Sequence, residues 1–66
     1  MAKEKFSLVG IDGNAYSVMG YTARCMKEVG YSQEEITKFY ELATKSDYNN
    51  LITVSQEQID KCNNKL

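Results

Sequence analysis

The sequence contains no histidine and only two cysteines. Without histidine the chain has no imidazole to serve as a general base, as a metal ligand or as part of a histidine-based catalytic triad. Two separated cysteines, Cys25 and Cys62, cannot form a cysteine-rich zinc site within one chain. We therefore expect a protein that is not an enzyme and that uses no metal and no cofactor.

Long apolar runs, a leader sequence and an excess of basic charge are also missing. The longest apolar run falls far short of the roughly 20 residues of a membrane span, and no charged-then-apolar leader opens the sequence. Eight Lys and Arg against nine Asp and Glu give a net charge of −1, which disfavours general nucleic-acid binding. We expect a cytoplasmic protein with reduced thiols and no membrane association; one Cys25–Cys62 disulfide is the alternative.

The chain is short for a domain that is stable by itself. At 66 residues it can bury only about 60% of the surface of its unfolded chain. Domains of this size usually need disulfides, a metal or a partner subunit. We therefore expect one small domain over residues 1–66, with residues 1–4 and 63–66 frayed, that is completed by formation of a homo-oligomer.

The run from Lys5 to Ile11 alternates partly between polar and apolar residues and is rich in strand formers, which predicts a short strand. Its partner would be residues 51–54 or the same strand of another subunit. The predicted fold class is accordingly α+β, mostly helical, with a short N-terminal strand followed by two to three helices.

Helical periodicity begins at Asn14. The first helix has one apolar face made of Ala15, Val18, Met19, Thr22, Cys25, Met26 and Val29. Asn14 or Asp12 can cap its start, and Gly30 stands where a C′ residue of positive φ is expected. Gly20, in the middle, costs about 1 kcal/mol against Ala and suggests close backbone packing.

Ser32 and Glu35 form a capping box that starts a second helix, with Tyr31 and Ile36 spaced as a hydrophobic staple. This helix should end near Lys45 and bury Ile36, Phe39, Tyr40 and Ala43. Residues 46–50 have turn and cap chemistry, and a third apolar face then follows, made of Leu51, Val54, Ile59, Cys62 and Leu66. We favour helix there; the alternative is a strand over 52–54 followed by a second capping box over 55–58.

The stretch Gly-Ile-Asp-Gly-Asn-Ala-Tyr, residues 10–16, joins the predicted strand to the first helix. Backbone N–H groups at such a junction can hold a phosphate or a carboxylate, which makes Asp12, Gly13 and Asn14 candidate ligand-binding residues. The alternative is a simple turn, with Gly13 at positive φ and Asn14 or Asp12 as the cap. If Asp12 caps the helix, its carboxylate competes with any anion.

Four further residues of the first helix are candidates for the same ligand. Tyr16 and Tyr21 lie off the main apolar face, so they either cover the strand or form an exposed patch that stacks on a base or a partner. Arg24 and Lys27 can add positive charge when an oligomer brings several copies together; the alternative is that they favour the helix C-terminus electrostatically.

Asp12-Gly13-Asn14-Ala15-Tyr16, Gly20, Gly30, Glu35-Ile36 and Asp47-Tyr48-Asn49-Asn50-Leu51 together resemble a family of very short, uncharacterised proteins encoded by tailed phages, prophages and their hosts. The similarity covers roughly residues 8–59. The family has an Asp-Gly-Asn-Ala-aromatic turn that opens a helix and an Asp-Tyr-x-x-Leu segment after a second one. Gly often precedes Asp-Tyr in the family, whereas this chain has Ser46, so the geometry of that turn is open.

The resemblance implies a setting, the cytoplasm of a phage-infected host, rather than an activity. Very short phage proteins without catalytic residues often bind a host protein or sequester a small signalling molecule in counter-defence. We therefore expect a non-enzymatic homo-oligomer that sequesters a small anionic ligand, such as a nucleotide immune signal. The alternatives are a protein–protein inhibitor or adaptor of a host enzyme and a structural component.

Overall fold

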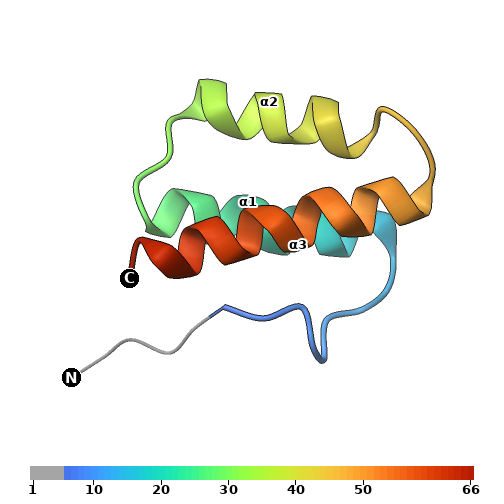
Figure 1. Cartoon of the computed structure of the whole chain (residues 1–66), viewed down its shortest axis with the longest axis horizontal. Helices are drawn as coiled ribbons and strands as arrows, with labels where there is room; N and C mark the ends of the chain where they lie inside the picture. Colours follow the sequence, from blue (N-terminus) through green and yellow to red (C-terminus); the bar gives the residue numbers. More distant parts are fainter. Residues whose placement is uncertain (1–5) are drawn as a thin grey trace.

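The computed structural model describes residues 6–66. They contain three consecutive α-helices, α1 (Ala15–Glu28), α2 (Gln33–Ala43) and α3 (Tyr48–Asn64). Figure 1 shows that α1 and α3 run in the same direction and that α2, drawn above both, runs in the opposite direction. The N-termini of α1 and α3 therefore lie at the same end of the bundle as the C-terminus of α2.

Each helix begins at a residue whose side chain accepts a hydrogen bond from a first-turn amide. Asn14 caps α1, Ser32 caps α2 through the predicted capping box with Glu35, and Asp47 caps α3. α2 ends at Ala43, slightly before the predicted position near Lys45. These short-range bonds satisfy amides that have no partner inside the helix.

The end of α1 is a Schellman motif around Gly30, as the sequence predicts. Gly30 has a φ of +97°. Its amide donates to the carbonyl of Lys27 at 3.1 Å, and the amide of Tyr31 donates to the carbonyl of Met26 at 2.9 Å. Glycine adopts this left-handed conformation without the steric cost that a Cβ atom brings. The motif reverses the chain into α2.

The predicted N-terminal strand is wrong, and so is the α+β class, because residues 6–66 contain no β-strand. The suggested pairing segment, residues 51–54, lies inside α3. We call residues 6–14 the N-terminal segment; it runs along the bundle without helical or strand structure (Figure 1). Lys5 and residues 1–4, which we expected to fray, lie outside the described residues.

Side chains of the bundle satisfy the main chain of the N-terminal segment in place of a second strand. The amide of Phe6 donates to Oδ1 of Asn63 at 2.7 Å, and Nδ2 of Asn63 donates to the carbonyl of Phe6 at 3.0 Å. The amide of Ser7 donates to the hydroxyl of Tyr21 at 3.0 Å. Residue 63, expected to fray, is thus part of α3 and holds this segment.

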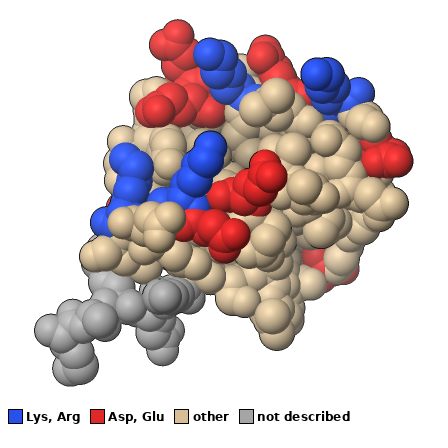
Figure 2. Space-filling model, in the orientation of Figure 1, with Lys and Arg blue, Asp and Glu red and all other residues tan. Residues whose placement is uncertain are grey.

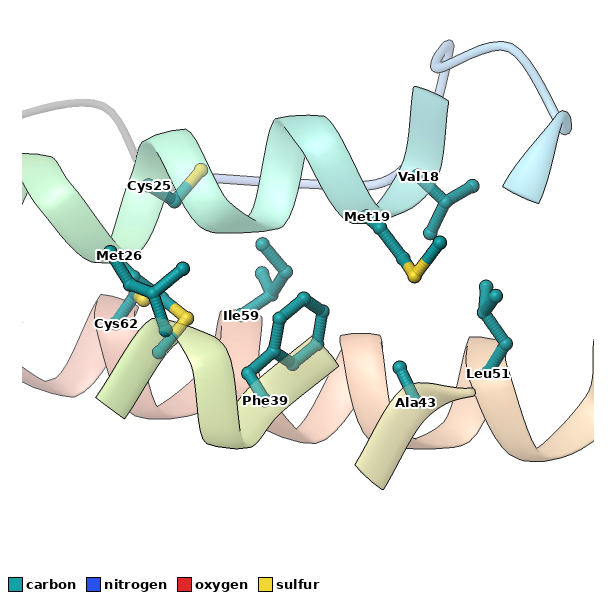
Figure 3. Close-up of a cluster of buried hydrophobic side chains, with 10 residues drawn as sticks. Val18, Met19, Cys25, Met26, Phe39, Ala43, Leu51, Ile59 and Cys62 are labelled. Carbon is teal, nitrogen blue, oxygen red and sulfur yellow. The ribbon is translucent and has the colours of Figure 1, made fainter. Parts of the chain in front are cut away.

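One face of each helix meets the others in a single core. The fully or nearly fully buried apolar residues are Val18, Met19, Cys25, Met26, Ile36, Phe39, Ala43, Leu51, Ile59 and Cys62. On the surface, acidic and basic side chains are interspersed over α2 and the C-terminal half of α3, as Figure 2 shows. In the interior, Figure 3 shows the Phe39 ring beside Ile59 at the middle of the core.

Two details of the sequence prediction for the helices are corrected. Ser55 does not begin a second capping box, because it is completely buried in the middle of α3. Gly20 is exposed, and a Cβ atom added there would meet nothing within 4 Å, so close backbone packing does not explain it. Cys25 and Cys62 are both free thiols inside the core.

Candidate functional site

The loop before α1 is a β-turn followed by a helix cap. The amide of Ile11 donates to the carbonyl of Leu8 at 3.1 Å, with Gly10 at a φ of +85°. A positive φ at the third residue of a β-turn favours glycine. Gly13 is not among the glycines of positive φ, so the predicted role of Gly13 in this turn belongs to Gly10.

The side chains of Asp12 and Asn14 occupy two of the amides that we expected to hold an anion. Oδ1 of Asn14 accepts from the amide of Tyr16 at 2.8 Å, and Oδ1 of Asp12 accepts from the amide of Asn14 at 3.2 Å. Asn14 is therefore the cap, and Asp12 places a carboxylate next to it. An anion bound at this turn would meet competition from both oxygens.

A hollow of about 330 Å³ lies beside this loop, at the end of the bundle where the N-termini of α1 and α3 meet the C-terminus of α2. We call it the tyrosine groove. Its lining residues are Ala15, Tyr16, Met19, Ala43, Thr44, Ser46, Asp47, Tyr48 and Leu51. Met19, Ala43 and Leu51 belong to the buried core, so the groove opens directly onto apolar side chains.

Two tyrosines give this groove its character. Tyr16 is 82% exposed and Tyr48 is 47% exposed. The hydroxyl of Tyr48 donates to the carbonyl of Gly13, which ties the start of α3 to the loop before α1. The groove therefore has one aromatic ring held in place and one that is largely free in solvent.

Tyr48 was not among the site residues predicted from the sequence. In the sequence, Asp47 and Tyr48 belong to the family resemblance and to the predicted turn over residues 46–50. Asp47 does cap α3, because its side chain accepts from the amide of Asn50 at 3.0 Å. A cap at residue 47 puts Tyr48 on the first turn of α3. Its proximity to Tyr16 depends on how α1 and α3 pack, and local sequence does not carry that information.

Tyr21 covers the N-terminal segment and is not part of an exposed patch. Its side chain is half-buried, and its hydroxyl accepts from the amide of Ser7. Burial raises the pKa of this phenol above its ordinary value, while the hydrogen bond from Ser7 acts in the opposite direction. Of the two alternatives for this residue, the structure supports the covering role.

Arg24 and Lys27 are exposed on α1 but lie away from the tyrosine groove. They follow Tyr16 by eight and eleven residues, which at 1.5 Å per residue is about 12 and 16 Å along the helix axis. Within one chain the structure does not bring these cations to the loop or to the groove. Only a neighbouring copy or an elongated ligand would combine them with Tyr16.

The two thiols are sealed inside the bundle. Burial raises the pKa of Cys25 and that of Cys62, so both favour the neutral thiol. A thiol of raised pKa and low exposure is a poor nucleophile. Among residues 6–66, no three His, Cys, Asp or Glu side chains gather where they could hold a metal ion.

No helix in the described part of the chain is long and apolar enough to cross a membrane. Comparisons with protein-family models, with curated proteins and with solved structures each find no match to this chain. The resemblance to short phage proteins consequently stays a prediction from the sequence.

Proposed function

We propose that this chain is a non-enzymatic binding protein that takes up a small anionic ligand carrying a planar ring, of which a nucleotide is the foremost class. The observation that carries the proposal is the tyrosine groove, an apolar hollow flanked by Tyr16 and Tyr48. Aromatic side chains next to an apolar floor are typical of sites that stack on a nucleobase.

The size of the groove sets the part of the ligand that it takes. Small-molecule pockets have volumes of roughly 300 to 1,000 Å³, and this hollow of about 330 Å³ lies at the lower end of that range. It accommodates a ring of nucleobase size over Met19 and Leu51, with the rest of the ligand outside. The exposed ring of Tyr16 would stack on the outer face of that base.

Two helix N-termini beside the groove favour a negatively charged ligand. The first turns of α1 and α3 carry partial positive charge, which favours a phosphate nearby. Asn14 and Asp47 cap one amide on each helix, so the phosphate would be held weakly by a single chain. Homo-oligomerisation, in which a neighbouring copy supplies Arg24 or Lys27, would add the missing charge.

Native mass spectrometry of the purified protein, alone and with mono-, di- and cyclic nucleotides, tests this proposal. We expect a homo-oligomer that retains a nucleotide. Tyr16→Ala should weaken binding at least tenfold, equivalent to about 1.4 kcal/mol, while circular dichroism stays unchanged because the ring is exposed. Tyr31→Phe, outside the groove, serves as the control.

Gly13→Ala tests the contribution of the loop to ligand binding independently of Tyr16. Gly13 is not at positive φ, and a Cβ atom there would stand 3.5 Å from the Tyr48 hydroxyl, an ordinary contact. The variant should therefore fold, and it should lose affinity only if the ligand approaches the loop backbone. A protein that retains no nucleotide, or whose Tyr16→Ala variant binds as well as the parent, overturns the proposal.

A second candidate function is binding to a host protein, as an inhibitor or an adaptor. It is favoured by large apolar side chains that the described residues leave exposed, Val9 at 89% and Leu42 at 53% in addition to Tyr16. Tyrosine-rich apolar surfaces are typical of the centres of protein interfaces. This candidate predicts no nucleotide in native mass spectrometry and a stable complex in a pulldown from host lysate.

A further inference from the structure

A second hollow, of about 220 Å³, lies between α2 and α3 near the opposite end of the bundle from the tyrosine groove. We call it the lysine groove. Its lining residues are Met26, Tyr31, Glu35, Lys38, Phe39, Leu42, Gln58 and Lys61. No residue of this set was singled out as a ligand-binding candidate in the sequence.

The floor of the lysine groove is apolar and its two sides carry cations. Met26 and Phe39 are core residues, and Leu42 is 53% exposed at the edge. Lys38 comes from α2 and Lys61 from α3, so the two lysines line the groove from different helices. In Figure 2, basic side chains are interspersed with acidic ones over this face.

A third cation lies at one end of the groove. Nζ of Lys65 lies 4.7 Å from the centre of the Tyr31 ring, and Tyr31 is one of the lining residues. A lysine over an aromatic face is held there by the ring quadrupole. This contact keeps the positive charge of Lys65 beside the groove.

Glu35 is the single carboxylate among the residues that line the lysine groove, and it is already engaged. It accepts hydrogen bonds from the amide of Ser32 at 3.0 Å and from the hydroxyl of Ser32 at 3.1 Å. Its charge therefore stabilises the start of α2. Two lysines and one carboxylate therefore line the groove around an apolar floor, and Lys65 lies beside it over Tyr31.

We propose that the lysine groove is a docking site for an acidic amphipathic peptide segment of a partner protein. An apolar side chain of the peptide would lie on Phe39 and Leu42, and its carboxylates would pair with Lys38 and Lys61. Lys38 and Lys61, one on each wall of the groove, complement carboxylates that flank an apolar residue. The proposal concerns a different surface from the tyrosine groove and does not depend on nucleotide binding.

The test measures fluorescence anisotropy of a fluorescein-labelled amphipathic peptide with Leu on one face and Glu on the other, titrated with the full chain. The same peptide with Lys in place of every Glu is the negative control. We expect binding of the acidic peptide only, with affinity that falls as salt is raised. Leu42→Ala should weaken it about fivefold, because the apolar contact is lost.

Two double variants of equal charge make the test specific. K38E/K61E should weaken binding of the acidic peptide at least tenfold, whereas K27E/K45E, which changes the same charge outside the groove, should change it less than threefold. Circular dichroism of both variants verifies the fold, and nucleotide retention by K38E/K61E should equal that of the parent.

Three results would overturn the proposal. The first is no binding of the acidic peptide at millimolar concentration. The second is an equal loss in the two double variants, which would indicate attraction without a site. The third is binding to phosphatidylglycerol vesicles that depends on Lys38 and Lys61 while the peptide fails to bind, which would assign the surface to lipid.

Discussion

Individual polar side chains inside the bundle differ in whether their hydrogen bonds are made. Thr22 is fully buried, and its hydroxyl donates to the carbonyl of Val18 at 2.9 Å. Ser55 is just as buried, but its hydroxyl has no hydrogen-bond partner among the described residues. A buried hydroxyl without a partner costs about 1 to 3 kcal/mol. We therefore expect Ser55 to destabilise the core, whereas the hydrogen bond of Thr22 offsets the burial of its hydroxyl.

Ser55→Ala should stabilise the protein by about 1 kcal/mol, because it removes the unpaired hydroxyl and places a better helix former in α3. Urea denaturation followed by circular dichroism measures the change in the free energy of unfolding. Thr22→Val is the matched control and should bring no gain, since it removes a hydroxyl whose hydrogen bond is made. A loss of stability in Ser55→Ala would contradict the prediction.

The helices are started by residues next to them in the sequence, whereas the N-terminal segment is held by residues far away. The capping box of α2 involves neighbours three positions apart, Ser32 and Glu35. The bonds from Phe6 reach Asn63, 57 positions along the chain. Local sequence consequently determines where each helix starts, while the path of the N-terminal segment depends on completed packing.

The capping box should make α2 sensitive to acid. Hydrogen bonds from the amide and hydroxyl of Ser32 lower the pKa of Glu35 below its ordinary value of 4.5. Since the pKa of Glu35 is lower in the folded state than in the unfolded state, its stabilisation of the fold is complete above pH 4.5. The stabilisation is lost as the pH falls through the lowered folded pKa. Thermal unfolding of Glu35→Gln should depend less on pH in this acid range than that of the parent.

Glu34→Gln is the control for that experiment, because Glu34 lies on the same exposed turn without a hydrogen bond to Ser32. Its melting temperature should follow the parent's dependence on pH below 4.5 more closely than that of Glu35→Gln does. Equal pH dependence in Glu35→Gln and the parent would show that the capping box does not contribute.

Asn63→Ala should release the N-terminal segment, since Asn63 bonds both main-chain polar groups of Phe6. We expect a loss of about 1 to 2 kcal/mol for two partly buried hydrogen bonds and faster amide hydrogen exchange at Phe6 and Ser7. Asn64→Ala, at the exposed neighbouring position, should leave both unchanged. Protection at Phe6 that survives in Asn63→Ala would mean that side-chain packing alone holds the segment.

The whole molecule depends on one core shared by three short helices. Two-state domains have stabilities of about 0.05 to 0.15 kcal/mol per residue, which for 66 residues is about 3 to 10 kcal/mol. Phe39 contributes to that core from α2, with its ring between the other helices (Figure 3). Within residues 6–66, the buried apolar residues of all three helices belong to this one cluster.

Phe39→Ala should therefore unfold all three helices together, because removing a buried Phe side chain costs about 3 to 5 kcal/mol. Far-UV circular dichroism should show loss of helix at room temperature or a large fall in melting temperature. Leu42→Ala, in the same helix but 53% exposed, should remain folded. Retention of the parent melting temperature in Phe39→Ala would contradict a single cooperative core.

The sequence by itself determined the first two helices, the capping box of the second and most of their buried faces, and it favoured a third helix over a strand at residues 52–54. The physical reason is range: a cap such as Asn14, a Schellman glycine such as Gly30 and an apolar face at helical spacing depend on residues within a few positions. The sequence predicted a positive φ at Gly13, whereas Gly10 has it, because the hydrogen bond from Ile11 to Leu8 places Gly10 third in the β-turn.

Tertiary structure alone decided what happens to the predicted strand and where a site can form. A strand needs a partner strand, but its candidate partner, residues 51–54, is part of α3. The side chains of Tyr21 and Asn63 instead form hydrogen bonds with the main chain of Phe6 and Ser7. The tyrosine groove likewise exists because α1 and α3 run parallel and bring Tyr16 to Tyr48. Contacts between residues so far apart in the chain follow from packing free energy, which no local pattern of residues encodes.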